Sequence, residues 1–194
     1  MCAMLTVLGN RRNPGEQDLV DLLSECHDRI RRFVALAREA ATRHDVPADQ
    51  ISRACADVER YFTAALPLHV ADEDESIAPR RRGLSSEVDR ALDKMEDQHQ
   101  GHAPKIEALL GVVAEVGRDP SDQDSRRALA GVAADLEVDL EQHLALEEAI
   151  LFPAVRDMLS RETQTQVMEE LRQRRRQNGP HAVATGTGTR SESA

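Results

Sequence analysis

The chain has 194 residues, which suits one domain of ordinary size, and its 35 acidic against 25 basic residues give a formal net charge of −10 at neutral pH. This acidic balance argues against a nucleic-acid-binding protein, which normally carries a basic face. Aromatic residues make up only 2% of the chain, and since β-rich folds depend on aromatic and β-branched residues, the composition argues against a β-sandwich or barrel.

The first predicted helix begins close to the N-terminus. Asn13 is interpreted as its N-cap, with Pro14 at the first helical position and Glu16 as the capping-box residue. Apolar residues then recur at alternating steps of three and four, which is the pattern of a helix with one buried stripe. This pattern predicts a helix that ends near His44.

The second predicted helix follows the break at residues 45–47. Its buried stripe starts at Ile51 and reaches the polar residue Glu73. Pro79 and Gly83 are expected to close this helix, on either side of a short run of three arginines.

The third and fourth predicted helices are separated by the breakers of residues 117–120. Ser85 or Ser86 caps the third helix, whose stripe covers residues 88–113, and the stripe of the fourth covers residues 129–154. Helices of about 30 residues joined by short connections are typical of sequential antiparallel neighbours. The sequence therefore predicts an all-α fold, an antiparallel up-down-up-down four-helix bundle.

The bundle is expected to occupy residues 14–158. An N-terminal arm of residues 1–13 precedes it, and a short C-terminal helix over residues 159–176 follows it. Residues 177–194 hold almost no large apolar residue, so this tail is expected to be disordered.

Two prolines fall inside the predicted helices, Pro67 in the second and Pro104 in the third, each two residues from a histidine on the buried stripe. A proline removes one backbone hydrogen bond and kinks a helix. We expect both kinks to lie close to the functional centre.

No apolar run approaches the roughly 18–20 residues that span a bilayer, and residues 1–8 lack the basic start and the cleavage pattern of a signal peptide. The cysteines Cys2, Cys26 and Cys55 are odd in number and form neither a CxxC motif nor a zinc-knuckle spacing. We therefore expect no membrane association and a location in the reducing cytoplasm.

Polar residues interrupt the buried stripes. Five of the seven histidines lie on the buried faces, namely His27, His69, His99, His102 and His143. Two of them are followed four residues later by a glutamate, His69 by Glu73 and His143 by Glu147. Residues at i and i+4 project from one helix face, so each pair offers an imidazole and a carboxylate to one point.

The two pairs are also an internal repeat. They are offset by 74 residues, and His27 and His99, on the preceding helices, are offset by 72. At a rise of 1.5 Å per residue, these positions agree in depth along the bundle to within about two turns. A bundle with pseudo-two-fold symmetry would bring both sets to a single site on its axis.

A lone histidine on an apolar stripe is usually a core residue, but five histidines and two glutamates at one depth indicate a metal centre. A buried carboxylate without a partner costs several kcal/mol, and a metal ion relieves the whole cluster. Imidazole with carboxylate suits iron, manganese or zinc. Zinc prefers four ligands, fewer than the candidates present. Ferritin-like di-iron sites use Glu-x-x-His, which is matched on a stripe only by Glu96 and His99. A histidine-rich site for two metals therefore fits these residues better than either alternative.

At these residues the sequence resembles the hemerythrin family, specifically bacterial proteins with the HHE cation-binding domain, over about residues 16–157. The resemblance is carried by residues 26–30, 68–73, 97–99 and 143–153. It implies a non-haem di-iron centre that binds O2, or an iron or redox sensor built on the same site. It also implies two irons per chain, joined by carboxylates and an oxo or hydroxo group.

Carried over from the family, the iron ligands are His27, His69, His99 and His143, and the bridging carboxylates are Glu73 and Glu147. The departure is on the third helix, where oxygen-carrying hemerythrins place two histidine ligands four residues apart. His99 and His102 are three apart. His102 is interpreted as a fifth histidine ligand, and the alternative is a packed residue beside the site.

The status of His102 decides how many coordination positions stay open. Two octahedral irons offer about twelve positions, of which the bridging groups fill about six and five histidines fill five. One position then remains for O2, and a second opens if His102 is not a ligand.

Three hypotheses stay open: an O2-binding or sensing di-iron protein, a di-iron enzyme acting on peroxide, nitric oxide or O2, and a metal-free interaction bundle with pH-sensitive histidines.

Two charged clusters flank these residues. The surplus carboxylates of residues 72–75 are interpreted as solvated. Four arginines, Arg172, Arg174, Arg175 and Arg176, help to give residues 172–194 a net charge of +4. This run is interpreted as a solvated helix end, and a contact with an acidic protein partner is the alternative.

Overall fold

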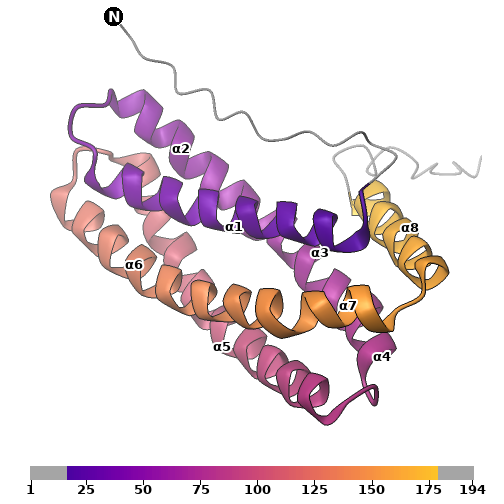
Figure 1. The fold of residues 1–194 in the computed structure, drawn as a ribbon. Helices are drawn as coiled ribbons and strands as arrows, with labels where there is room; N and C mark the ends of the chain where they lie inside the picture. Colours follow the sequence, from indigo (N-terminus) through magenta and orange to yellow (C-terminus); the bar gives the residue numbers. More distant parts are fainter. Residues whose placement is uncertain (1–16, 179–194) are drawn as a thin grey trace, which may run out of the picture.

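The computed structural model describes residues 17–178. Their helices form four long rods and one further helix at an end, and Figure 1 shows how these run antiparallel. The first rod is α1 (Leu19–Thr42), and the third is α5 (Ser86–Arg118). The second rod is formed, in order, by α2 (Ala48–Arg60), η1 (Tyr61–Ala65), α3 (Leu66–Ala71), η2 (Asp72–Ile77) and α4 (Ala78–Arg81). The fourth rod is formed by α6 (Gln123–Leu146), η3 (Glu147–Leu151) and α7 (Phe152–Met158). The further helix is α8 (Arg161–Asn178).

The rods pack in a square. α1 lies against α2 and α6, and α5 lies against the same two helices from the other side. This arrangement confirms the predicted all-α four-helix bundle. The apolar core fills both ends: a large cluster with Val58, Leu109 and Leu136 lies towards the α1–α2 turn, and smaller clusters with Ile77 and Leu92 lie towards α8. A buried polar layer separates them.

The first helix starts later than the sequence analysis predicts. α1 begins at Leu19, and Asp18 is its N-cap. The Asp18 carboxylate accepts a hydrogen bond from the Asp21 amide at 2.8 Å, and the Asp21 carboxylate accepts one from the Asp18 amide at 3.1 Å. This reciprocal pair satisfies two of the amides that every helix start leaves free. The predicted cap at Asn13 and the predicted arm of residues 1–13 lie outside the described residues.

Three π-helical segments interrupt the second and fourth rods. Each runs into a helix whose first turn holds a proline, Pro67 after η1, Pro79 after η2 and Pro153 after η3. A proline has no amide hydrogen and its ring clashes with the carbonyl four residues earlier, so the helix widens just before it. The prediction that Pro79 closes the second helix is wrong, because α4 continues to Arg81. α5 stays α-helical across Pro104.

The C-terminal helix α8 closes the end of the bundle, beside the start of α1 and beyond α7 (Figure 1). Its apolar residues Val167 and Leu171 are buried with Leu19, Leu23 and Phe152. The predicted disordered tail starts at residue 177, but residues 177–178 still belong to α8. The rest of that tail lies outside the described residues.

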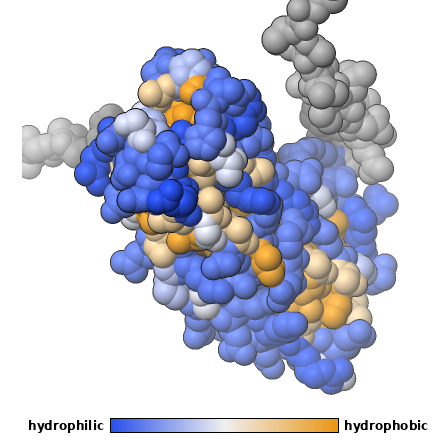
Figure 2. Space-filling view, turned by 90° about the vertical axis from the view of Figure 1, so that its left-hand side faces the viewer, coloured by the Kyte–Doolittle hydropathy of each residue, from blue (hydrophilic) through white to orange (hydrophobic). Residues whose placement is uncertain are grey.

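Polar residues dominate one visible face of the molecule (Figure 2). The face in Figure 2 is mostly hydrophilic, with small hydrophobic areas between the helices. Among the described residues, no helix is both long enough and apolar enough to cross a membrane.

Candidate metal centre

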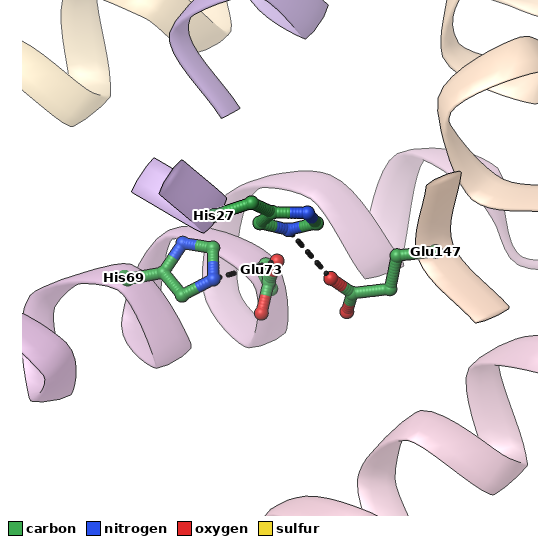
Figure 3. A group of neighbouring side chains, drawn as sticks. All are labelled: His27, His69, Glu73 and Glu147. Carbon is green, nitrogen blue, oxygen red and sulfur yellow. Dashed lines mark ion pairs between the residues drawn. The ribbon is translucent and has the colours of Figure 1, made fainter. Parts of the chain in front are cut away.

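Every long rod contributes to the polar layer. His27 comes from α1 and His69 from α3, His99 from α5 and His143 from α6, and the carboxylates of Glu73 and Glu147 come from the π-helical segments η2 and η3. All six side chains are at most 8% exposed. Figure 3 shows His27, His69, Glu73 and Glu147 pointing towards one another from three of the rods.

These six residues form two groups that share both glutamates. One group contains His27 and His69 with Glu73 and Glu147, and the other contains His99 and His143 with the same two carboxylates. In each group the ligand atoms lie within 4.8 Å of one another. The structure therefore brings together six of the seven residues that the sequence analysis selects, in two adjacent sets.

Each glutamate directs one oxygen to each group. Glu73 Oε1 lies 3.3 Å from His69 Nε2, and Glu73 Oε2 lies 3.3 Å from His99 Nε2. Glu147 Oε2 lies 3.0 Å from His27 Nε2, and Glu147 Oε1 lies 3.4 Å from His143 Nε2. A carboxylate that faces two sets of imidazoles in this way has the geometry of a bridge between two cations.

The polar atoms of the cluster fit a cation better than they fit one another. Among the described residues, seven buried atoms of the cluster have no hydrogen-bond partner, namely His27 Nε2, both ring nitrogens of His69, Glu73 Oε2, His99 Nε2 and both carboxylate oxygens of Glu147. Buried polar atoms are nearly always paired in folded proteins. Nitrogen and oxygen lone pairs that converge at 3.0–3.4 Å without a hydrogen bond between them are what a metal ion requires.

The outward nitrogens of three imidazoles are held by further polar residues. His27 Nδ1 lies 2.9 Å from Glu148 Oε1, His99 Nδ1 lies 3.1 Å from Asp74 Oδ1, and His143 Nδ1 lies 3.2 Å from Gln98 Oε1. An acceptor on Nδ1 fixes the proton there and leaves Nε2 free to ligate. These partners were not predicted from the sequence, although the repeat contains a signal for two of them, since Asp74 directly follows Glu73 and Glu148 directly follows Glu147.

Burial sets the protonation of the cluster. It lowers the pKa of His69 to about 3 and that of His143 to about 4, against the opposing charge of Glu147, so both imidazoles are neutral at pH 7. Burial and then the charge of Glu147 raise the pKa of Glu73 well above its usual value. Two adjacent buried carboxylates cannot both ionise without compensation, and cations between them would supply it.

Arg81 is a buried cation that the sequence analysis placed in a run at the helix end. It is 2% exposed, and it donates a hydrogen bond from Nη1 to the Leu151 carbonyl. Burial lowers its pKa to about 10, and the negative charges of Glu147 and Glu73 oppose that shift. Arg81 therefore adds positive charge to the environment of both Glu73 and Glu147.

The interpretation of the acidic residues 72–75 as solvated is wrong for Asp72, which is fully buried and pairs with Arg174 and Arg175 of α8. Asp74 and Glu75 are exposed, and Asp74 also contacts His99. The two pairs of Asp72 correct the interpretation of the arginine run as a solvated helix end. Arg172 and Arg176 do lie exposed beside Glu169.

His102 lies beside the cluster and belongs to neither group. Its ring stands edge-on to the His143 ring, with 5.2 Å between the centroids. Burial, followed by the charge of His99, lowers the pKa of His102. The side chain faces a pocket of about 520 Å³ that is bounded by α3, α5 and α6 and is also lined by His69, His99 and His143.

Four antiparallel rods that carry histidines and carboxylates to one buried layer define the class: a helical-bundle protein with a candidate metal centre in its core. The chain belongs to the hemerythrin family, since the family model for the Hemerythrin HHE cation binding domain matches residues 18–155. It is also similar to an uncharacterized protein of Haemophilus influenzae (strain ATCC 51907 / DSM 11121 / KW20 / Rd), with 25% identity over 166 residues, which is 80% of this chain and 89% of that protein.

Proposed function

We propose that the protein holds two iron ions in the bundle core, one in each histidine pair, and that Glu73 and Glu147 bridge them. The observation that carries this proposal is the opposed placement of the two carboxylates, each with one oxygen 3.0–3.4 Å from an imidazole nitrogen of either group. The six proposed ligands are His27, His69, Glu73, His99, His143 and Glu147.

The donor set supports iron over the other first-row metals. Imidazole nitrogens with bridging carboxylate oxygens suit iron, whereas a zinc site closes with four ligands and prefers thiolates in structural roles. Neither group includes a cysteine. Membership of the hemerythrin family supports the same assignment.

We further propose that the bound metal takes up O2 or a similar small uncharged ligand. The protein would then serve in O2 or redox sensing, in iron storage or in carriage. The histidine-lined pocket beside the centre gives such a ligand access. Its wall is mostly apolar, and its lining contains no lysine or arginine. When bound, the iron supplies the electrons for this chemistry. The protein's own residues orient the imidazoles, keep them neutral and restrict water at the apolar wall.

The alternative is an enzyme that uses the same centre on peroxide, nitric oxide or O2. One observation favours it: the pocket of about 520 Å³ is within the range of organic-ligand sites and exceeds what a diatomic molecule needs. Multiple turnover with peroxide or nitric oxide would select this alternative over simple binding.

Metal analysis tests the proposal. Protein purified and reconstituted with Fe(II) under anaerobic conditions should contain close to two irons per chain, and chelation should lower its thermal midpoint because metal-binding free energy adds to folding free energy. Exposure to O2 should then produce a charge-transfer absorption band. A chain without metal, whose melting is unchanged by chelator, would instead be a metal-free bundle.

A further inference from the structure

The C-terminal helix α8 lies outside the family match, which ends at residue 155, and yet it contacts the chain next to two proposed ligands. The guanidinium of Arg175 lies 2.6 Å from Asp72 Oδ2 and 3.8 Å from Cys26 Sγ. Asp72 directly precedes Glu73, and Cys26 directly precedes His27. One side chain of α8 therefore touches the neighbours of a bridging carboxylate and of an imidazole on a different rod.

The Asp72 carboxylate depends on α8 for its charge compensation. Its side chain is 0% exposed, and its ion-pair partners among the described residues are Arg174 on Oδ1 and Arg175 on Oδ2. A buried carboxylate that loses such partners must leave its position or carry an uncompensated charge. Either outcome acts on η2, the segment that also carries Glu73.

Further contacts attach α8 to the same segment. Arg174 donates from Nη2 to Ser76 Oγ at 3.2 Å and pairs with Glu75 at 2.9 Å. Glu170 of α8 accepts two hydrogen bonds from Arg80, at 2.6 and 3.1 Å, and Arg80 also donates to the Ser76 carbonyl. η2 is thus held from α8 along most of its length.

The segment needs this support because it is π-helical. A π-helical turn is uncommon and is retained mainly where surrounding contacts or function require it. Pro79 of α4 removes one backbone donor just after η2, and η2 places Asp72 and Glu73 side by side in the interior. Relaxation of η2 towards a regular helix would rotate Glu73 away from the histidines.

We propose that α8 positions the metal centre, with Arg174 and Arg175 as positioning residues that hold Glu73 through Asp72. This role rests on the proposed metal site. The part of the proposal that concerns the fold, namely that α8 holds η2 in place, does not need a metal to be present. Outer residues that orient metal ligands typically change metal affinity by about 10- to 100-fold when they are replaced. We expect an effect of that size from α8, with no contact between its arginines and the metal.

The test compares two full-length double variants, Arg174→Gln with Arg175→Gln, and Arg172→Gln with Arg176→Gln. Both remove two positive charges from α8, but Arg172 and Arg176 are exposed and pair with Glu169. A third variant adds Asp72→Asn to the first pair, which removes the buried charge that the two arginines compensate. The readouts are hydrogen exchange of residues 66–81 in the metal-free protein and the rate at which a chelator extracts Fe(II) or Co(II).

The Arg174/Arg175 variant should exchange η2 amides faster and release metal about 10- to 100-fold faster, while the Arg172/Arg176 variant behaves as the unaltered chain. The added Asp72→Asn change should restore slow exchange and most of the metal retention, and a loss of stability unrelated to the Asp72 charge would not be rescued in this way. Unchanged exchange and unchanged release in the Arg174/Arg175 variant would overturn the proposal. If the unaltered chain binds no metal, the proposed function fails, and the exchange data still decide whether α8 holds η2.

Discussion

Glu73 and Glu147 are equivalent residues of two helical hairpins, and each contacts one histidine of its own hairpin and one of the other. Glu73 joins His69 to His99, and Glu147 joins His143 to His27. The internal repeat of the sequence is therefore crossed in space. Neither hairpin alone contains all the residues of a group, so the site forms only when the two hairpins pack together.

Replacement of either bridging glutamate should abolish binding of at least one metal. Glu73→Gln and Glu147→Gln keep the side-chain volume but remove the charge and one of the two oxygen donors, so one group loses a ligand. Metal content measured after reconstitution should fall from about two ions per chain to one or none. Glu59→Gln, an exposed position on the same rod as Glu73, is the control. An equal loss in the control would contradict the bridging assignment.

The contact between Glu148 and His27 should also affect metal affinity. Glu148→Gln weakens the acceptor on His27 Nδ1, and the loss of such an outer partner typically lowers affinity by about 10- to 100-fold. The measurement is a competition titration with a chelator of known affinity. Glu141→Gln is a matched control because Glu141 pairs with the same Arg31 but has no contact with His27. If both variants behave alike, Arg31 and not His27 explains the effect of Glu148.

The bundle and six of the proposed ligands were predictable because both depend on helical periodicity. A stripe with steps of three and four identifies the buried face, and His69 with Glu73 and His143 with Glu147 are visible as polar residues on it. Their common depth then follows from the rise per residue. Long, strongly periodic helices are the elements for which this reasoning works best.

The partners of the ligands were not predictable by the same reasoning. Asp74 and Glu148 lie one residue past the stripe, and their contacts depend on the wider turns of η2 and η3, which no α-helical stripe describes. The pairing of Asp72 with Arg174 joins residues about a hundred positions apart. Nothing local to either residue distinguishes such a buried pair from two solvated charges.

The raised pKa of Glu73 leads to a prediction for the metal-free protein. In the folded chain this carboxyl keeps its proton above the ordinary value of 4.5, because burial and Glu147 oppose ionisation. Stability is therefore lost as the pH rises through the window above 4.5. Glu73→Gln removes this loss, so at pH 7 the metal-free variant should be more stable than the metal-free unaltered chain.

The pH dependence of that difference is the sharper measurement. As the pH falls to 4.5 and below, the carboxyl of the unfolded chain also takes up its proton, and the stability difference should decline to a small residual value. The low pKa values of His69 and His143 affect both chains alike and cancel in the comparison. Urea unfolding of both metal-free chains between pH 4.5 and 7.5 checks this. A difference that does not change with pH would mean that Glu73 is ionised in the metal-free fold.

In the proposed two-metal site, the role of His102 decides how many coordination positions stay open. Its ring packs edge-on to His143 at the wall of the pocket, outside both ligand groups. We therefore expect His102→Ala to keep close to two metals per chain and to leave the absorption spectrum of the iron-loaded protein unchanged. Truncation of a buried side chain should lower the free energy of unfolding by about 1–3 kcal/mol.

The same variant should speed the binding of azide or nitric oxide, because removal of the imidazole enlarges the pocket beside His143. His99→Ala, only one turn earlier on α5, is the contrasting variant, since it removes a proposed ligand and should release metal. A changed charge-transfer spectrum in His102→Ala would instead make His102 the fifth histidine ligand. The proposed two-metal centre would then have one open position and not two, and the site would favour binding of a single small ligand over chemistry that needs two positions.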